Sequence, residues 1–192
     1  ADCTGHGVPG ALMTVIGSNL LNQTVIDNKL LDPSQILLVL DNLINQTLKQ
    51  QKEHEHIVQD GMDVFILKVD KLNKEFTFAS AKRPAIFIRN KELVEYKGSK
   101  HSLGGTITGC KVFNETKVKF QEDDIIYLFT DGCTDQFGGE KGKKFSIQQL
   151  RETLLSIHSK KPSDQKQLLE TKMDEWKENH EQVDDILLIG IK

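Results

Sequence analysis

Apolar residues recur at helical intervals in the first quarter of the chain and predict two helices there. Pro9-Gly10 opens the first. The second begins at Asp32-Pro33-Ser34-Gln35, where the aspartate can cap the helix, the proline suits its first position and the glutamine can complete a capping box. The apolar stripe of the second helix includes Ile36, Leu40, Leu43, Ile44 and Leu48, and that of the first includes Leu12, Val15, Ile16 and Leu20 with the polar Asn19.

The middle of the chain consists of short apolar runs separated by turn residues, a pattern typical of antiparallel hairpins. Asn90-Lys91 marks a tight turn, and the segment from Gly98 to Thr108 predicts a loop because it is rich in Gly, Ser and Thr. The predicted strands are Met62 to Val69, Glu75 to Ala79, Ala85 to Arg89, Leu93 to Tyr96, Val118 to Phe120 and Ile125 to Phe129. The last of these is apolar throughout, so we expect it inside a sheet that is covered on both faces.

Two more helices and a closing strand follow. Ser146 and Gln149 form a second capping-box pattern, and Pro162-Ser163-Asp164 starts the next helix. The expected inward residues are Phe145, Ile147, Leu150, Leu154 and Ile157 at the first of these helices and Leu168, Leu169, Met173 and Trp176 in the second. The final strand is predicted from Ile186 to Ile191. This order of helices, antiparallel strands, helices and a strand predicts a layered α+β fold, in one domain spanning residues 1–192.

Composition excludes several classes of protein. The 192 residues are 38% hydrophobic and 28% charged, which suits a globular domain with a sizeable core. A net charge of −3 with interspersed signs gives no basic face for nucleic acid, and no apolar run is long enough to span a bilayer. Cys3, Cys110 and Cys133 form no C-x-x-C pair, and this sparse, odd set fits a reducing compartment. We therefore expect a cytoplasmic protein.

Three aspartates are candidates for a metal site. Asp131 follows one apolar strand and Asp184 precedes another, so antiparallel pairing of those strands would bring both carboxylates to one sheet edge. Asp2 precedes a glycine-rich turn and would join them if that turn packs over the same edge. Three carboxylates suit Mg²⁺ or Mn²⁺ rather than zinc. Any one of these aspartates alone is better explained by turn chemistry.

The motifs that contain these aspartates carry a family resemblance. The segment from Asp2 to Ala11 reads Asp-Cys-Thr-Gly-His-Gly-Val-Pro-Gly-Ala, and Phe129-Thr130-Asp131-Gly132 and Asp184-Asp185-Ile186 follow later. Together with Asp60-Gly61-Met62-Asp63 at a strand start, they resemble the motifs of SpoIIE-type bacterial members of the PPM (type 2C) metal-dependent serine/threonine phosphatases. The blocks occur in the family's order from Ala1 to Lys192. The resemblance implies a β-sandwich of two antiparallel sheets flanked by helices.

The resemblance also implies a reaction and a set of metal ligands. Asp2 would bridge two Mn²⁺ or Mg²⁺ ions, the backbone carbonyl of Cys3 would ligate one of them, and Asp131 and Asp184 would complete the protein ligands. Paired cations lower the pKa of a bound water, which then attacks the phosphorus of phosphoserine or phosphothreonine without a phosphoenzyme. His6 could give a proton to the leaving oxygen, although we favour a structural or exposed role for it.

Several expectations about partners rest on the same resemblance. The substrate would be a small phosphorylated regulator of the anti-anti-sigma (STAS) type, and a sensor domain would precede this region in a longer chain, tethered in some cases to a membrane. The two early helices, from Pro9 to Gln50, would act as a regulatory element that positions Asp2. Family members carry further strands upstream, including one with another metal-ligating Asp. We therefore expect a truncated domain with weak metal affinity and poor turnover, and an exposed sheet edge that can pair with a second copy as a homodimer.

Two alternative functions remain open at this point. The chain could be a catalytically inactive, phosphatase-like module that binds a partner. The second alternative is a dinucleotide-binding oxidoreductase, because Gly5-His6-Gly7-Val8-Pro9-Gly10 matches G-x-G-x-x-G and Asp27 lies near the distance expected of a ribose ligand. No strand is predicted before this motif and Pro9 interrupts it, so the second alternative has little support.

Two further features have no assigned role. Lys82 and Arg83 lie between two strands and could meet a phosphate, but a Lys-Arg pair at a hairpin is usually a solvated turn. Cys133 lies two residues after Asp131, and a small, partly buried thiol explains it better than a reactive one.

Overall fold

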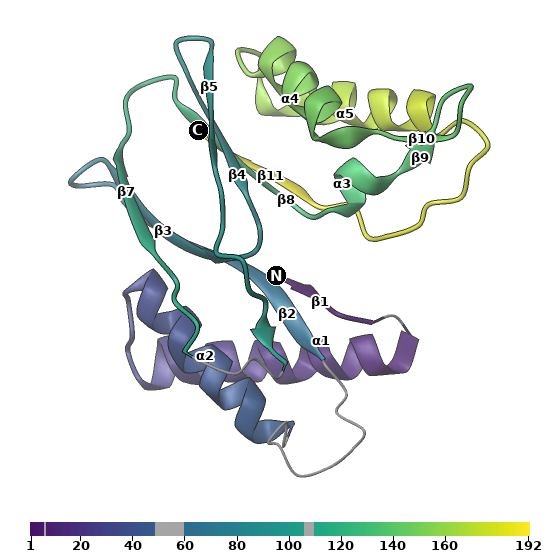
Figure 1. Ribbon diagram of the computed structural model, residues 1–192. Coiled ribbons are helices and arrows are strands. Elements are labelled where there is room, and N and C mark those ends of the chain that lie inside the picture. Colours follow the sequence, from purple (N-terminus) through teal and green to yellow (C-terminus); the bar gives the residue numbers. More distant parts are fainter. Residues whose placement is uncertain (6, 49–59, 106–109) are drawn as a thin grey trace. The chain divides into compact units, whose positions relative to one another are not determined.

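The computed structural model describes residues 1–5, 7–48, 60–105 and 110–192, which form two compact units (Figure 1). The first unit comprises Ala1–Arg83 and Lys97–Phe120, and the second comprises Pro84–Tyr96 and Gln121–Lys192. Each contains its own sheet and its own hydrophobic core. Every pairing between the named strands is antiparallel, which confirms the predicted α+β class. The described helices include none that is both long and apolar enough to cross a membrane.

The first unit packs helices against a sheet of order β1-β2-β3-β7, with β6 also paired to β2. Its elements are β1 (Asp2–Cys3), α1 (Gly7–Asn22), the π-helix η1 (Gln23–Asp27), α2 (Pro33–Thr47), β2 (Gly61–Asp70), β3 (Glu75–Ala81), β6 (Leu103–Gly104) and β7 (Glu115–Lys119). Helix α2 begins as predicted, because the carboxylate of Asp32 accepts hydrogen bonds from the backbone N–H groups of Ser34 and Gln35. Its residues Ile36, Leu40 and Ile44 are buried in the core of this unit.

The second unit packs α4 and α5 against a sheet of order β11-β8-β4-β5. Its elements are β4 (Ala85–Arg89), β5 (Glu92–Tyr96), β8 (Ile125–Phe129), α3 (Gly132–Asp135), β9 (Phe137–Gly138), β10 (Lys143–Lys144), α4 (Ser146–Ile157), α5 (Pro162–Lys177) and β11 (Leu188–Ile191). Asn90 and Lys91 both have positive φ angles, as a tight two-residue hairpin turn between β4 and β5 requires. Leu150, Leu154 and Ile157 of α4 are buried as predicted.

Some details differ from the sequence predictions. Leu12 and Val15 of the predicted apolar stripe are 59% and 58% exposed, because α1 buries Gly10, Met13 and Gly17 instead. In α5, Leu168 is 40% exposed and Gln165 is buried in its place. The predicted loop from Gly98 contains the short strand β6, and its positions 106–109 lie outside the described residues. The final strand is shorter than predicted and begins at Leu188.

Candidate metal centre

Asp131 follows β8, a largely buried strand of the second unit. The apolar side chains of β8 fix this strand in the sheet, and Ile125, Ile126 and Tyr127 are each at most 3% exposed. The chain then turns at once into α3, for which Asp131 occupies the position before the first helical residue. The backbone carbonyl of Asp131 accepts hydrogen bonds from the N–H groups of Thr134 and Asp135. The backbone at Asp131 is therefore held at the end of β8.

Asp184 reaches the same sheet edge by way of β11. Strands β8 and β11 pair antiparallel with Leu188 opposite Phe129, so the residues before Leu188 lie beside those after Phe129. Thr130 fixes this approach, because its hydroxyl donates to the carbonyl of Asp185 at 2.8 Å and accepts from the N–H of Leu187 at 3.0 Å. The antiparallel pairing on which the prediction for these two aspartates depended is confirmed.

A glycine lets the two aspartate segments come together. The backbone of Asp185 lies directly against Gly132, where an added Cβ would be 2.8 Å from the carbonyl carbon of Asp185 and still closer to its oxygen. Any side chain at position 132 would therefore push the two segments apart. The glycine after Asp131 has a packing role that is independent of backbone flexibility.

Asp2 lies in the first unit, on the short edge strand β1. This strand pairs antiparallel with β2, and Asp2 is directly opposite Asp63 while Cys3 is opposite Met62. A strand thus precedes the glycine-rich turn, contrary to the prediction, but it belongs to an antiparallel sheet. Dinucleotide-binding motifs sit in parallel β-α-β units, so the oxidoreductase alternative loses its structural context.

Arg83 joins the two opposed carboxylates. One terminal nitrogen of its guanidinium lies 2.5 Å from Oδ2 of Asp2 and 3.1 Å from Oδ2 of Asp63. The side chain of Arg83 is 13% exposed, whereas that of Lys82 is 60% exposed and lies 3.6 Å from Asp63. Of the two basic residues that the sequence left unassigned, the arginine belongs to a partly buried ionic cluster and the lysine lies at its rim.

Asp63 is a site residue that was not predicted from the sequence. The side chain of Asp63 is 7% exposed and accepts a hydrogen bond of 2.5 Å from the hydroxyl of Ser102, in addition to its contact with Arg83. The available signal was an acidic residue near the start of a mostly apolar strand, since a buried carboxylate requires partners. Its position opposite Asp2 becomes apparent only from the register of β1 and β2.

Two other predicted residues have different outcomes. Cys133 is buried, its thiol donates to the carbonyl of Leu187 at 3.4 Å, and burial raises its pKa to about 11. Its burial supports the interpretation of Cys133 as a small thiol packed in the core. His6 lies outside the described residues.

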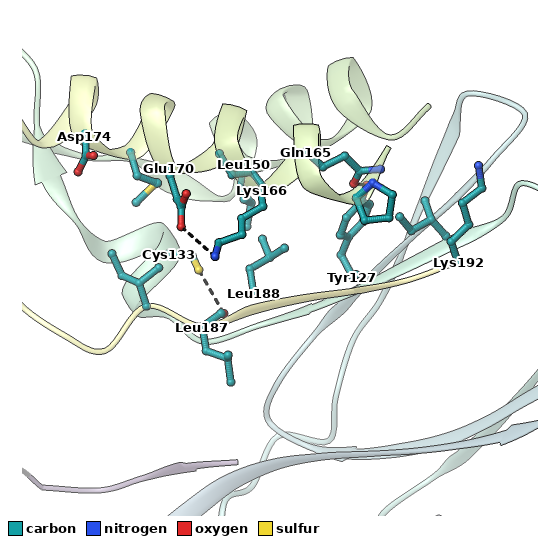
Figure 2. A pocket seen from close by; sticks show the side chains of 16 residues that line it. Tyr127, Cys133, Leu150, Gln165, Lys166, Glu170, Asp174, Leu187, Leu188 and Lys192 are labelled. Atoms are coloured by element: carbon teal, nitrogen blue, oxygen red, sulfur yellow. Dashed lines mark hydrogen bonds and ion pairs between the residues drawn. The ribbon is translucent and has the colours of Figure 1, made fainter. Parts of the chain in front are cut away.

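A separate cavity of about 820 Å³ lies in the second unit between α5 and the β8–β11 face (Figure 2). Leu150, Leu169, Met173 and Leu188 give it an apolar lining. The hydroxyl of Tyr127 reaches Gln165 at 2.7 Å in its wall, and Lys166 pairs with Glu170 at 3.7 Å. None of the four predicted metal ligands lines this cavity, so it is distinct from the candidate metal centre.

The structure describes the predicted ligands in two groups. Asp2 and Cys3 belong to the first unit, and Asp131 and Asp184 belong to the second. Among the described residues, no group of three or more His, Cys, Asp or Glu side chains has an arrangement that could hold a metal ion. The union of all three carboxylates in one centre stays a prediction.

The donor chemistry within each unit suits a divalent cation. Asp2 and Asp63 already share a cationic group, the guanidinium of Arg83, which shows that this carboxylate pair attracts positive charge. Asp131 and Asp184 add carboxylate oxygens, which are the ligands that Mg²⁺ and Mn²⁺ prefer. The residues present therefore fit the predicted metals better than they fit zinc.

Comparisons with known proteins agree with this fold. The sequence model of the family described as Stage II sporulation protein E (SpoIIE) matches residues 1–192. A search of curated proteins gives no match. Among solved structures, the SiaA-PP2C domain of Pseudomonas aeruginosa is 26% identical with a TM-score of 0.87, and the match covers 99% of this chain and 72% of that one.

Two less similar structures share the fold. The match to the PP2C phosphatase domain and regulatory fragment of SpoIIE from Bacillus subtilis has 12% identity and a TM-score of 0.73, and covers 97% of this chain and 51% of that one. The match to the RsbU and RsbW domains of Rv1364c from Mycobacterium tuberculosis has 18% identity and a TM-score of 0.70, and covers 98% of this chain and 49% of that one. The present chain thus spans about half of each of these two chains.

Proposed function

Because this chain belongs to the SpoIIE family and is a PP2C-type phosphatase domain, we propose that it hydrolyses phosphoserine or phosphothreonine in a regulatory protein by a two-metal mechanism. The observation that supports the proposal most is the antiparallel pairing of β8 with β11, because the segments that carry Asp131 and Asp184 adjoin these strands. The family model matches the chain along its whole length. Two carboxylates at one sheet edge supply oxygen ligands of the kind that bind Mg²⁺ and similar divalent cations.

The ligands would be Asp2, the backbone carbonyl of Cys3, Asp131 and Asp184. Bound Mn²⁺ or Mg²⁺ would supply an activated water and neutralise charge on the phosphoryl oxygens. The protein's own contribution is to hold the ligands in place. Thr130 anchors the Asp184-Asp185 segment through two hydrogen bonds, and the pairing of β1 with β2 fixes the backbone at Asp2.

The substrate and the regulation form the finer part of the proposal. The family resemblance implies a phosphorylated partner of the STAS type, and the solved neighbours, which include RsbU and RsbW domains and a cell fate determinant, support a regulatory role in general. For regulation, the early helices are the candidate element. Buried Leu40 packs α2 against the sheet that contains β2, and the adjacent Asp41 accepts hydrogen bonds from Lys111 and from the N–H of Gly104. Movement of α2 would thereby reach the strand that faces Asp2.

Phosphopeptide hydrolysis tests this function. Phosphate release from phosphoserine, phosphothreonine and phosphotyrosine peptides would be measured with Mn²⁺, with Mg²⁺ and with a chelator. We expect metal-dependent release from the first two peptides and little from the third. Metal-independent release would contradict the mechanism. Binding of a phosphorylated regulator without any release, under all metal conditions, would favour the inactive partner-binding module.

A further inference from the structure

Asp2 and Asp63 form a pair of like charges that needs a cation. The two residues are directly opposite each other on β1 and β2, and their side chains are 20% and 7% exposed. Like charges directly across an antiparallel pair destabilise the sheet, and burial increases the cost because little water is present to screen them. A cation in contact with both carboxylates removes this repulsion.

Arg83 supplies that cation from a fixed position. Its backbone N–H donates to the carbonyl of Ala81 at 2.9 Å, and its own carbonyl accepts from the hydroxyl of Ser80 at 2.5 Å. Gly98 packs against the same carbonyl, where an added Cβ would be 2.8 Å from the oxygen. The anchoring of the backbone means that the guanidinium is directed at the carboxylate pair and is not the end of a loose surface side chain.

The guanidinium and a metal would compete for the same carboxylate. Arg83 contacts Oδ2 of Asp2. A divalent ion bound to the carboxylate of Asp2 would bring a second positive charge close to the guanidinium. Metal binding at Asp2 must therefore break or weaken this ion pair. Asp63 accepts a hydrogen bond from Ser102 at Oδ1 and contacts Arg83 at Oδ2. Asp63 can therefore retain its ion pair with Arg83 after the ion pair between Arg83 and Asp2 is broken.

We propose that Arg83 is a resident counter-ion of Asp2 that sets the metal affinity of the site, and that Asp63 is the anchor that retains the arginine when a metal displaces it from Asp2. Arg83 and Asp63 are thus positioning residues. This inference rests on the proposed function, since it takes Asp2 to be a metal ligand. It explains why a buried arginine accompanies a predicted ligand and why an acidic residue interrupts an apolar strand.

Metal binding in the absence of substrate tests the proposal. Mn²⁺ would be titrated calorimetrically into the wild-type chain and into Arg83→Gln, Arg83→Lys and Lys82→Gln. Removing the competing charge in Arg83→Gln is expected to tighten Mn²⁺ binding by about tenfold or more, the ratio that corresponds to one charge-assisted hydrogen bond. Arg83→Lys keeps the positive charge, so its Mn²⁺ affinity should remain close to that of the wild type. Lys82→Gln is the matched control and should change affinity little, because Lys82 is exposed.

Melting temperature, measured with and without Mn²⁺, tests the proposal even if Arg83→Gln folds poorly without metal. Arg83→Gln leaves the two carboxylates opposed without this cation, so it should gain more in melting temperature on addition of Mn²⁺ than the wild type gains. A metal-free variant that is unfolded but folds on addition of Mn²⁺ would support the proposal in the same way, and a variant that stays unfolded at saturating Mn²⁺ would overturn it.

The outcomes separate this inference from the proposed function. If the wild type binds Mn²⁺ and Arg83→Gln binds it equally or more weakly, the counter-ion role is wrong while the phosphatase assignment stands. If the wild-type chain binds no Mn²⁺ at all, the two-metal mechanism itself fails for this chain, and the counter-ion role fails with it.

Discussion

The carbonyl group of Asp185 rests on Gly132, with no space between them for a side chain. This contact joins the segment after β8 to the segment before β11, and each of those segments carries one of the predicted metal ligands. The spacing of Asp131 and Asp184 therefore depends on the absence of a Cβ at position 132.

Gly132→Ala is expected to separate these segments. The added methyl would lie 2.8 Å from the carbonyl carbon of Asp185, and overpacking of this kind costs about 1–3 kcal/mol of unfolding free energy. Mn²⁺ affinity should fall with it. Chemical denaturation and calorimetry would measure the two effects. Gly17→Ala is the matched control, since its methyl would meet only the flexible thioether of Met62 at 3.0 Å. Equal effects of the two variants would contradict the packing role of Gly132.

Thr130→Val removes the hydroxyl that bridges the same segments. The variant loses the hydrogen bonds to the carbonyl of Asp185 and from the N–H of Leu187 and leaves two backbone groups without this partner. We expect a loss of about 1–3 kcal/mol in unfolding free energy. Thr130→Ser retains the hydroxyl and should recover most of that loss. If Thr130→Ser destabilises the chain as much as Thr130→Val, the retained hydroxyl confers no stability and the proposed role of these hydrogen bonds is wrong.

Lys111 and Asp41 form a buried ion pair that holds α2 to the loop containing β6. Nζ of Lys111 lies 2.6 Å from Asp41 and also donates to the carbonyls of Ser102 and Gly104. Lys111→Met leaves the carboxylate without its charge partner, and the expected cost is about 3–5 kcal/mol. The double variant with Asp41→Asn should be less destabilised than the two single variants combined. Additive losses in denaturant titrations would argue against direct coupling.

Several structural features could be predicted from the sequence. The Asp32 cap, the β4–β5 turn and the apolar strand β8 depend on neighbouring residues, so local patterns predicted them correctly. The placement of Asp131 and Asp184 at one edge needed only the assumption of antiparallel pairing.

What the sequence could not provide depends on register and on long-range packing. Asp63 faces Asp2 only because two strands separated by a long segment pair in one particular register, and a shift by one residue would turn Asp63 to the other face. Arg83 was set aside because basic residues at hairpins are usually solvated, and its burial depends on partners that are distant in the chain. The exposed apolar residues of α1 were misjudged for a related reason, since the helix packs through its small residues and Met13.

Stability should fall at high pH because of Tyr127. Burial raises the pKa of its phenol above the ordinary value of 10.0, so on raising the pH the unfolded chain loses this proton before the folded chain does. The unfolded state is then favoured, and unfolding free energy should decrease above about pH 10 with a slope of up to about 1.4 kcal/mol per pH unit from this group.

Tyr127→Phe provides the control. This variant lacks both the titrating group and the hydrogen bond to Gln165. Its unfolding free energy should therefore differ from that of the wild type at neutral pH, but should decline less steeply above pH 10. Urea titrations between pH 8 and 11 would compare the slopes. Identical slopes would mean that Tyr127 makes no contribution to alkaline unfolding.

The most direct test of the central claim is hydrolysis of p-nitrophenyl phosphate with and without Mn²⁺, in the 192-residue chain and in any longer protein that contains it. Asp131→Asn and Asp184→Asn would be compared with wild type, and Asp123→Asn would serve as the control because Asp123 is an exposed carboxylate paired with Lys192. We predict Mn²⁺-dependent turnover that falls to the metal-free level in the first two variants and is unchanged in the control. Turnover that survives in Asp131→Asn and Asp184→Asn, or a complete absence of Mn²⁺-dependent turnover in the wild type, would contradict the assignment of this chain as a metal-dependent phosphatase.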